Sequence, residues 1–569
     1  MLNMSANHRR RPQAIAGLIR KLNAFLSRRT VLKGLFGLGA GVASGSVLTA
    51  CENSAALAGG AAPSLPPGAE FGFLHGVASG DPLPDAVILW TRVTPADEAV
   101  AGNIPVSYQV AADPQMSVPV TSGSFTTNAS RDFTVKVDVS GLSPYTTYYY
   151  RFSTGEQQSP VGRTRTAPAA AEADRIRFAV VACSNYSFGF FNGFAAIAAR
   201  RDLDAVIHLG DYLYETGGRS QVPGRSHFPA KEIITLTDYR QRFAQYRQDP
   251  DLNEAHRQHP FISIWDDHET TNNSYRDGAA NHTPETEGDW FVRKGQAVRA
   301  YFEWMPIRDN AGGFDAPENG LLPEGNGSIQ RRLSYGNLID LILLDTRLAG
   351  RAVQNGTDIV SPEQTILGEA QRNWFLNELS SSSAQWKIVA QQMTFAPIKI
   401  IPLPEDQGGS FLNEDAWDGY RFDRNAVMQT IADNAIDNIV VLSGDTHVVT
   451  AFDLPIEPND PLQYNPATGE GSLAVEFSSN GIANVGIIGE FFMANNPHLK
   501  YSNLTLQGYL LLDVTAAQAQ GEYYYTGVPQ IRDATETFGS ALSTAAGDNH
   551  LTISPLPSSE RDDAPALAP

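Results

Sequence analysis

The chain has little cysteine, little positive charge and few long apolar runs. Only two of its 569 residues are cysteines, Cys51 and Cys183, so a disulfide framework is excluded. Its 42 lysines and arginines face 62 acidic residues, for a formal net charge of −20. This balance argues against a nucleic-acid-binding surface, because phosphate backbones need basic surface. After the first fifty residues, no stretch is long and apolar enough to predict a bilayer span.

The composition indicates a globular, loop-rich protein, with 42% apolar residues, 49 glycines and 35 prolines. The length predicts two or three domains, and no internal repeat is evident. Cys183 stands alone at the end of an apolar run, in "FAVVACSN". If Cys51 is modified, Cys183 has no intramolecular partner, so its thiol is either an inert part of the core or part of a reactive site.

The first 51 residues are typical of an export signal. Arg28 and Arg29 precede a weakly apolar, glycine-rich stretch, which resembles the twin-arginine pattern S-R-R-x-F-L-K with Val31 in the Phe position. An ordinary signal or an uncleaved anchor is the alternative. "LTAC" resembles a lipobox, which predicts a lipid tether at Cys51. We expect the twin-arginine export machinery as a partner and a periplasmic or secreted protein, tethered to the membrane if Cys51 is lipidated.

The rest of the chain divides by pattern. Residues 52–65 are small and rich in Gly and Pro, as in a linker. Residues 66–167 contain short alternating runs separated by turns, which predict a small β-sandwich; "GLSPYTTYYYRF" resembles a strand entry of fibronectin type III and Ig-like domains. Over residues 174–540, near-continuous apolar strands alternate with helical patterns, which predicts an α/β catalytic domain. Residues 541–569 are expected to form a C-terminal tail, whose last part, "SPLPSSERDDAPALAP", is expected to be disordered.

Polar side chains follow several of these predicted strands, at the end where sites of α/β sheets gather. They are Cys183, Asn185, Asp211, Tyr214, Asp266, Asp267, His268, Asp345, Arg347, Asp445, His447 and Asn480. A lone Asp after a strand is more often a helix cap or turn residue, and a lone buried Cys more often a small hydrophobe. The combination instead suits a two-metal site that activates hydroxide for attack on an ester phosphorus. Thiolate and phenolate favour a higher-valent metal at one position, and carboxylates a hard cation at the other.

The motifs "GDYLYE", "WDDHETTNN" and "SGDTH" together resemble those of PhoD-type alkaline phosphatases, which are metallophosphoesterases related to purple acid phosphatases. The resemblance covers about residues 66–540. It implies a metallophosphoesterase-type α/β sandwich behind the small all-β domain. It also implies a metal-dependent hydrolase of phosphate monoesters and diesters, small-molecule phosphate esters as substrates, and ferric iron with calcium as cofactors. Zinc and manganese are alternative metals.

The same resemblance assigns ligands. It implies Cys183, Tyr214 and His447 on iron, Asp211 as the bridge, Asp267 and Asp445 on calcium, and Asn273 as a further candidate. By resemblance His268 donates a proton to the leaving oxygen or hydrogen-bonds the phosphate; the alternative is a structural histidine. Asp266 is expected to orient His268 or a ligand.

The role of Arg347 and the function stay open from sequence, whereas Asn480 has a single expected role. Arg347 either clamps phosphate or pairs with Asp345, and Asn480 is read as a turn former. The function has two alternatives to a phosphatase. One is a phospholipase D-like diesterase on the same scaffold, and the other is a metal-binding lipoprotein without catalysis.

Overall fold

The computed structural model describes residues 64–569, except 66, 99–101, 172, 219, 310–328, 357, 405–406, 408, 485–494 and 563. The predicted signal with Arg28, Arg29 and Cys51, and most of the linker over 52–65, lie outside the described residues. Among the described helices, none has the length and apolar character needed to cross a membrane.

A sheet of eleven strands runs through the structure, in the order β29-β28-β27-β26-β11-β12-β13-β2-β3-β7, with β24 also paired to β11. At its centre β11 (Arg175–Ser184), β12 (Ala205–His208) and β13 (Pro260–Ser263) run parallel. On one side follow β26 (Gly508–Thr515), β27 (Gln518–Thr526), β28 (Glu536–Ala545) and β29 (Thr552–Ser554), all antiparallel. Because β11 to β13 are almost wholly buried, they read as continuous apolar runs, and α3 (Asn192–Ala199) returns the chain between β11 and β12.

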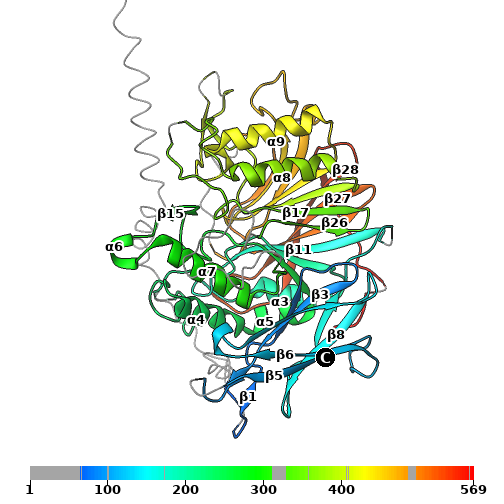
Figure 1. Ribbon diagram of the computed structural model, residues 1–569. Coiled ribbons are helices and arrows are strands. Elements are labelled where there is room, and N and C mark those ends of the chain that lie inside the picture. Colours follow the sequence, from blue (N-terminus) through cyan, green and yellow to red (C-terminus); the bar gives the residue numbers. More distant parts are fainter. Residues whose placement is uncertain are drawn as a thin grey trace, which may run out of the picture. The chain divides into compact units, whose positions relative to one another are not determined.

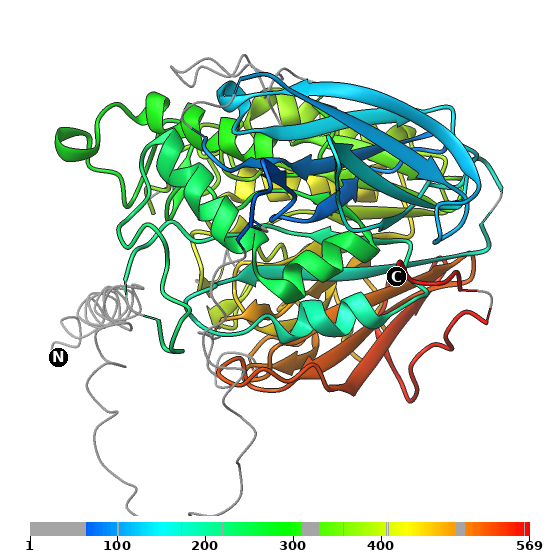
Figure 2. The same ribbon diagram turned by 90° about the horizontal axis from the view of Figure 1, so that it is seen from below.

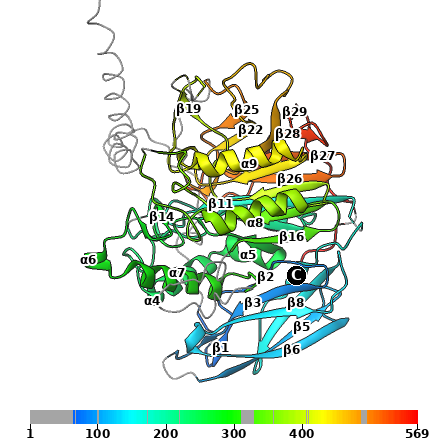
Figure 3. The same ribbon diagram turned by 45° about the horizontal axis from the view of Figure 1, so that its top comes forward.

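A second sheet of seven strands packs against the first. Its order is β16 (Arg331–Tyr335), β17 (Ile339–Leu343), β18 (Trp386–Ala390), β21 (Ile439–Ser443), β23 (Ser472–Ser478), β22 (Val449–Pro455) and β25 (Leu499–Asn503). One buried cluster joins the inner faces of both sheets, with Val180 of β11 and Ile388 of β18 among its members. Helices α8 (Gly368–Ser381) and α9 (Arg421–Asp433) cover the second sheet, whereas α4 (Leu236–Arg247), α5 (Pro250–Gln258) and α7 (Trp290–Trp304) lie on the far side of the first (Figures 1 and 3). The predicted α/β class is confirmed, with sheets predominating.

The N-terminal strands form a β-sandwich that shares a sheet with the rest. Its strands are β2 (Val77–Gly80), β3 (Ala86–Arg92), β5 (Ile104–Ala111), β6 (Pro119–Thr127), β7 (Thr134–Ser140), β8 (Thr147–Thr154) and β10 (Gly162–Arg165). The apolar faces of β2-β3-β7 and β10-β8-β5-β6 enclose one cluster. Strand β2 pairs in parallel with β13, so the two regions are continuous through hydrogen bonds. Gly80 permits this join, since a Cβ there would lie 2.5 Å from the Phe261 carbonyl oxygen. The fibronectin type III assignment stays a prediction.

The tail over residues 541–569 makes defined contacts where the structure describes it, so the disorder expected of its last part, from Ser554 on, is wrong. Strand β28 continues into this region and β29 pairs with it. Beyond β29, Arg561 forms an ion pair with the buried Asp204, and the last residues reach the side chain of Gln258. Partners elsewhere in the chain therefore hold a segment whose own composition is too poor in apolar residues to order it. Figure 2 shows the C-terminal strands in orange and red, apart from the N-terminal strands in blue and cyan.

Candidate metal centre

The strand-end residues adopt an unusual backbone conformation. Cys183, Asp211, Asn273, Asp445 and His447 have φ angles of 58°, 55°, 52°, 61° and 60°. Residues with a side chain rarely occupy this left-handed region, and strain of this kind clusters at functional sites. Four of these residues turn sharply at or just beyond the end of a buried strand, and Asn273 does so in the loop between β13 and β14 (Ser274–Tyr275), so that several polar side chains reach the same edge of the fold. This observation marks the edge as a candidate site.

One group of donors joins the loops after β11, β12 and β21. Single ligand atoms of Cys183, Asp211 and His447 lie within 4.8 Å of one another. The Cys183 Sγ is 3.6 Å from Asp211 Oδ2, and the Tyr214 hydroxyl donates to the same oxygen at 2.9 Å. The Tyr214 Oη is also 3.2 Å from His447 Nε2. The structure thus brings together the four side chains that the sequence assigns to iron, which we call the thiol end of the site.

Two further groups extend from this one. Asp211, Asp267 and His268 form the second, and Asp266, Asp267 and Asp445 form the third, each with ligand atoms within 4.8 Å. Asp211 belongs to the first and second groups, and Asp267 to the second and third. The three groups are therefore linked through shared carboxylates, and Asp211 occupies a bridging position. We call the third group the carboxylate end.

Asn273 also lies at the carboxylate end. Its backbone N–H donates to Asp267 Oδ2 at 2.6 Å. Its side-chain Oδ1 is buried without a hydrogen-bond partner, as is Oδ2 of Asp266. Buried oxygens without a donor are costly unless a cation supplies the missing positive charge. These two oxygens therefore suit a hard cation at this end of the site.

The electrostatics of the bare protein disfavour the anionic ligands. Burial, reinforced by Asp211, Asp266 and Asp445, raises the pKa of Cys183 well above its usual range. Burial also raises the pKa of Asp211 to about 7, and burial with Asp211 beside it raises the pKa of Tyr214. Bound cations reverse this balance, because coordination favours deprotonated thiol, phenol and carboxyl groups. The donor set therefore fits positively charged metals at both ends.

Arg347 lies among the carboxylates, with its side chain fully buried. Its guanidinium pairs with Asp266 at 2.5 Å, with Asp415 at 3.0 Å and with Asp445 at 3.3 Å. The alternative of a side-chain pair with Asp345 is not what the structure has, because that carboxylate accepts the backbone N–H of Arg347. The guanidinium already faces carboxylates on several sides, and its role as a phosphate clamp stays a prediction.

His268 stands between the two ends. Its Nδ1 is 2.6 Å from Glu215 Oε2, and its ring lies 4.2 Å from that of Tyr214, centroid to centroid. Burial lowers the pKa of His268, but Glu215, Asp211 and Asp267 outweigh burial and raise it well above its usual value. At Nδ1 this imidazole therefore contacts Glu215 and not Asp266.

Sequence reasoning missed Glu215 and two other polar residues. The buried Glu269 accepts the backbone N–H groups of Asp211 and Asp266, and so ties together the loops after β12 and β13. Asn484 follows β24 (Gly481–Ala483), and its amide donates to Tyr214 Oη at 2.9 Å and contacts His447 Nε2 at 3.1 Å. Glu215 is the last residue of "GDYLYE" and Glu269 the last residue of "WDDHE", so both lie in motifs that indicate the site. Asn484 ends "GIAN", which matches no such motif. The predicted turn residue Asn480 donates to a carbonyl outside the site.

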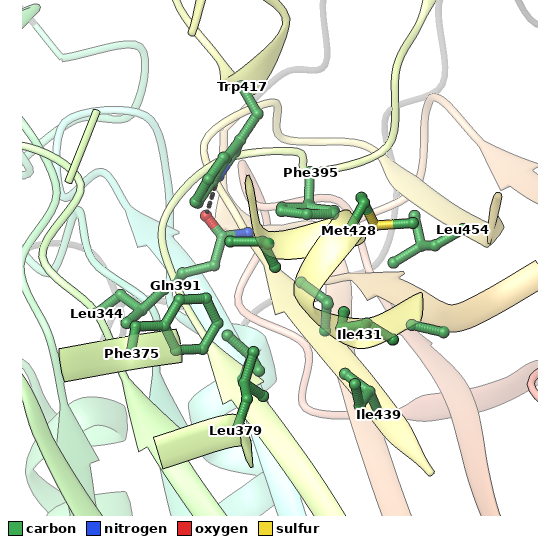
Figure 4. A pocket seen from close by; sticks show the side chains of 14 residues that line it. Leu344, Phe375, Leu379, Gln391, Phe395, Trp417, Met428, Ile431, Ile439 and Leu454 are labelled. Carbon is green, nitrogen blue, oxygen red and sulfur yellow. Dashed lines mark hydrogen bonds between the residues drawn. The ribbon is translucent and has the colours of Figure 1, made fainter. Parts of the chain in front are cut away.

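A pocket between the second sheet and α8 and α9 is not a candidate site. It is lined by apolar side chains such as Phe375, Met428 and Ile431 (Figure 4). At one end the indole N–H of Trp417 donates a hydrogen bond to Gln391 Oε1. Its cavity volume is only about 10 Å³, so at most one water molecule would fit. Its lining includes no acidic, basic or nucleophilic side chain.

Known proteins with a similar sequence or fold are phosphatases. Family models described as "PhoD-like phosphatase" and "PhoD-like phosphatase, N-terminal domain" match residues 178–523 and 60–168. Alkaline phosphatase D of Bacillus subtilis strain 168 is 34% identical over 551 residues, which cover 92% of this chain and 87% of that protein. The solved structure of PhoD has a TM-score of 0.76 at 31% identity, over 88% of this chain and 95% of that one. Purple acid phosphatase PPD1 of yellow lupin seeds shares the fold, with a TM-score of 0.52 at 12% identity, over 83% and 73% of the two chains.

Proposed function

This chain belongs to the PhoD-like phosphatase family and is a phosphoesterase, and from that premise we propose that it is an exported, metal-dependent alkaline phosphatase that also cleaves phosphodiesters. The observation that carries the proposal is the set of three donor groups linked through Asp211 and Asp267. A linked set of this kind suits adjacent cations that act on one phosphate group. Small-molecule phosphate esters are the substrates that fit the family.

The two ends of the site differ in the metal they suit. Cys183, Tyr214 and His447, with Asp211, would hold ferric iron, since thiolate and phenolate are strong anionic donors. Asp267, Asp445 and Asn273 would hold calcium through oxygen atoms. Zinc and manganese remain the alternatives. When bound, such cations would supply Lewis acidity toward the phosphoryl oxygens and lower the pKa of water, the chemistry that hydrolysis of a phosphate ester needs.

The chain's own residues move a proton and hold the metal ligands in place. His268 lies against the second donor group, beside the bridging carboxylate, where it donates a proton to the leaving oxygen. Arg347 balances the charge of the carboxylate end and keeps Asp266 and Asp445 in place. Glu269 fixes the backbone of the two loops that carry Asp211 and Asp266.

Export is proposed from the sequence, since Arg28, Arg29 and Cys51 lie outside the described residues. The twin-arginine pattern supports passage in the folded state, with the metals already bound, and the lipobox supports a tether at Cys51. Replacing both arginines by lysine is expected to leave active enzyme in the cytoplasm. Cys51→Ala is expected to release the enzyme from the membrane fraction. Normal export of the double variant, or a wild type already free of membranes, would refute the respective step.

The test of function is hydrolysis of a nitrophenyl phosphate, its bis-ester and phosphatidylcholine by purified protein of measured metal content. Turnover of the first two, with iron and calcium present, is the expected result. His268→Ala should lower the turnover of an alkyl phosphate by about 10²–10⁴-fold with the metals retained, the usual scale for a general acid. Preference for phosphatidylcholine would favour the phospholipase D-like alternative. Turnover of none of the three would favour a metal-binding lipoprotein.

A further inference from the structure

Glu215 is a buried carboxylate next to the proposed acid, and nothing in the mechanism above uses it. Its side chain is fully buried, and its Oε2 lies 2.6 Å from Nδ1 of His268. Its Oε1 accepts the backbone N–H of Asn272 at 2.9 Å and faces the Thr271 hydroxyl at 3.4 Å. Both carboxylate oxygens therefore act as acceptors, and the contact with the imidazole is made at Nδ1.

The imidazole is held on its other sides as well. The Tyr214 ring lies against it at 4.2 Å and 34°, and the backbone N–H of His268 donates to Asp211 Oδ1 at 3.3 Å. Within the part of the chain that the structure describes, no hydrogen bond to Nε2 of His268 is found. His268 keeps 8% of its surface exposed, whereas Glu215 keeps none. Nδ1 is thus hydrogen-bonded to Glu215, and Nε2 is the ring nitrogen that can contact a substrate.

We infer that Glu215 is the positioning residue of His268: it keeps a proton on Nδ1 and so presents Nε2 to the leaving oxygen of the phosphate ester. This inference rests on the proposed function, in which His268 is the acid. In the step itself the Nε2–H bond breaks, an O–H bond forms on the leaving group, and the imidazolium becomes neutral. The hydrogen bond on one ring nitrogen decides which nitrogen keeps its proton, so the neutral ring retains Nδ1–H toward Glu215.

Glutamine is the informative replacement because it keeps the shape of the side chain and changes only its hydrogen-bonding pattern. A carboxylate accepts at both oxygens, whereas an amide has one acceptor and one donor. The N–H of Asn272 takes the acceptor, so the amide NH₂ of Glu215→Gln faces Nδ1. That contact favours a bare Nδ1, so the ring loses the hydrogen bond from Nδ1–H that holds it. Nε2 is then no longer kept in place toward the leaving oxygen.

The experiment compares two esters in four variants of the full-length, metal-loaded enzyme: Glu215→Gln, His268→Ala, the two combined, and a control. Glu215→Gln should lower the turnover of an alkyl phosphate by about 10²-fold, within the range for general acids, and that of a nitrophenyl phosphate much less, since nitrophenolate needs no proton. Glu215→Gln added to His268→Ala should cause no further loss. Glu232→Gln is the matched control, because Glu232 also receives the Thr271 hydroxyl, at 3.2 Å, without touching His268. It should leave the ratio of the two rates unchanged.

Metal analysis of each variant provides a readout apart from activity, and iron and calcium should stay at the wild-type level. If Glu215→Gln does not fold, Glu215→Asp serves instead, since it keeps the charge but is too short to hold both contacts. Equal losses for the two esters, or a full further loss in the His268→Ala background, would overturn the inference. If His268→Ala itself fails to discriminate between the esters, the proposed acid is wrong. If only the Glu215 variants fail to do so, the proposed acid stands and this inference alone falls.

Discussion

The two ends of the site differ in chemistry although they share a loop. The thiol end offers sulfur, phenol and imidazole around one carboxylate, whereas the carboxylate end offers three aspartates and a buried arginine. Asp445 and His447 are two residues apart in "SGDTH", yet Asp445 belongs to the carboxylate end and His447 to the thiol end. Both have a left-handed backbone. One strained turn thus supplies donors of different softness, one to each end of the site.

The largest effect is expected where the two ends meet. Asp211→Asn keeps the size of the side chain but removes the charge that the thiol end shares with the second group, which Asp267 links to the carboxylate end, so both ends should lose metal. Phosphatase activity should fall to background, with iron and calcium reduced together in metal analysis. Loss of one metal with the other fully retained would show that Asp211 serves a single end and not both.

A smaller and selective effect should separate the ends. Cys183→Ser replaces a polarisable thiolate with a poor anionic ligand and should reduce iron much more than calcium. Asp445→Asn should have the opposite selectivity, because it removes an oxygen anion that a hard cation prefers. Metal content per protein, measured on enzymes purified alike, gives the ratio. The contrast between the ends would be refuted if both variants lost the two metals in the same proportion.

Next in size is a loss of stability at the carboxylate end. Arg347→Gln removes the cation among Asp266, Asp415 and Asp445, and breaking a buried ion network typically costs about 3–5 kcal/mol. The loss should appear in chelator as a lower unfolding midpoint and shrink when calcium is added. Arg332→Gln is the control, because its pair with Glu378 at 2.7 Å is on the surface and should contribute no more than about 1 kcal/mol. Similar midpoints for the two variants would contradict this account.

Much of this fold and site could be predicted from the sequence because the strand ends carry regular signals. Buried parallel strands read as apolar runs, and the chemistry follows them in "GDYLYE" and "SGDTH". The residues that orient others were harder to find. No local pattern shows which groups Glu215 and Glu269 contact once the site loops have folded. Asn484 approaches Tyr214 because β24 pairs with β11, which lies far away along the chain.

The errors have a similar cause, since each depends on contacts between distant segments. Arg347 lies two residues from Asp345, which made that pair plausible, but the turn after β17 directs its guanidinium toward Asp266. The tail is ordered by Asp204 and Gln258, whose location no local pattern reveals. The sandwich also joins the central sheet through β2 and β13, a pairing across almost two hundred residues.

The smallest expected effect concerns two amides, one at each end of the site. Asn484 donates to Tyr214 Oη at the thiol end, and Asn273 presents a buried Oδ1 at the carboxylate end. Loss of a group that orients a ligand typically costs 10–100-fold in metal affinity, so Asn484→Ala should weaken iron retention by about that factor and spare calcium. Asn273→Ala should weaken calcium and spare iron. Titration with a chelator, following each metal separately, measures both affinities in the same sample. If each alanine weakened both metals equally, the two ends would be one cooperative unit, and the division by donor chemistry would have to be abandoned.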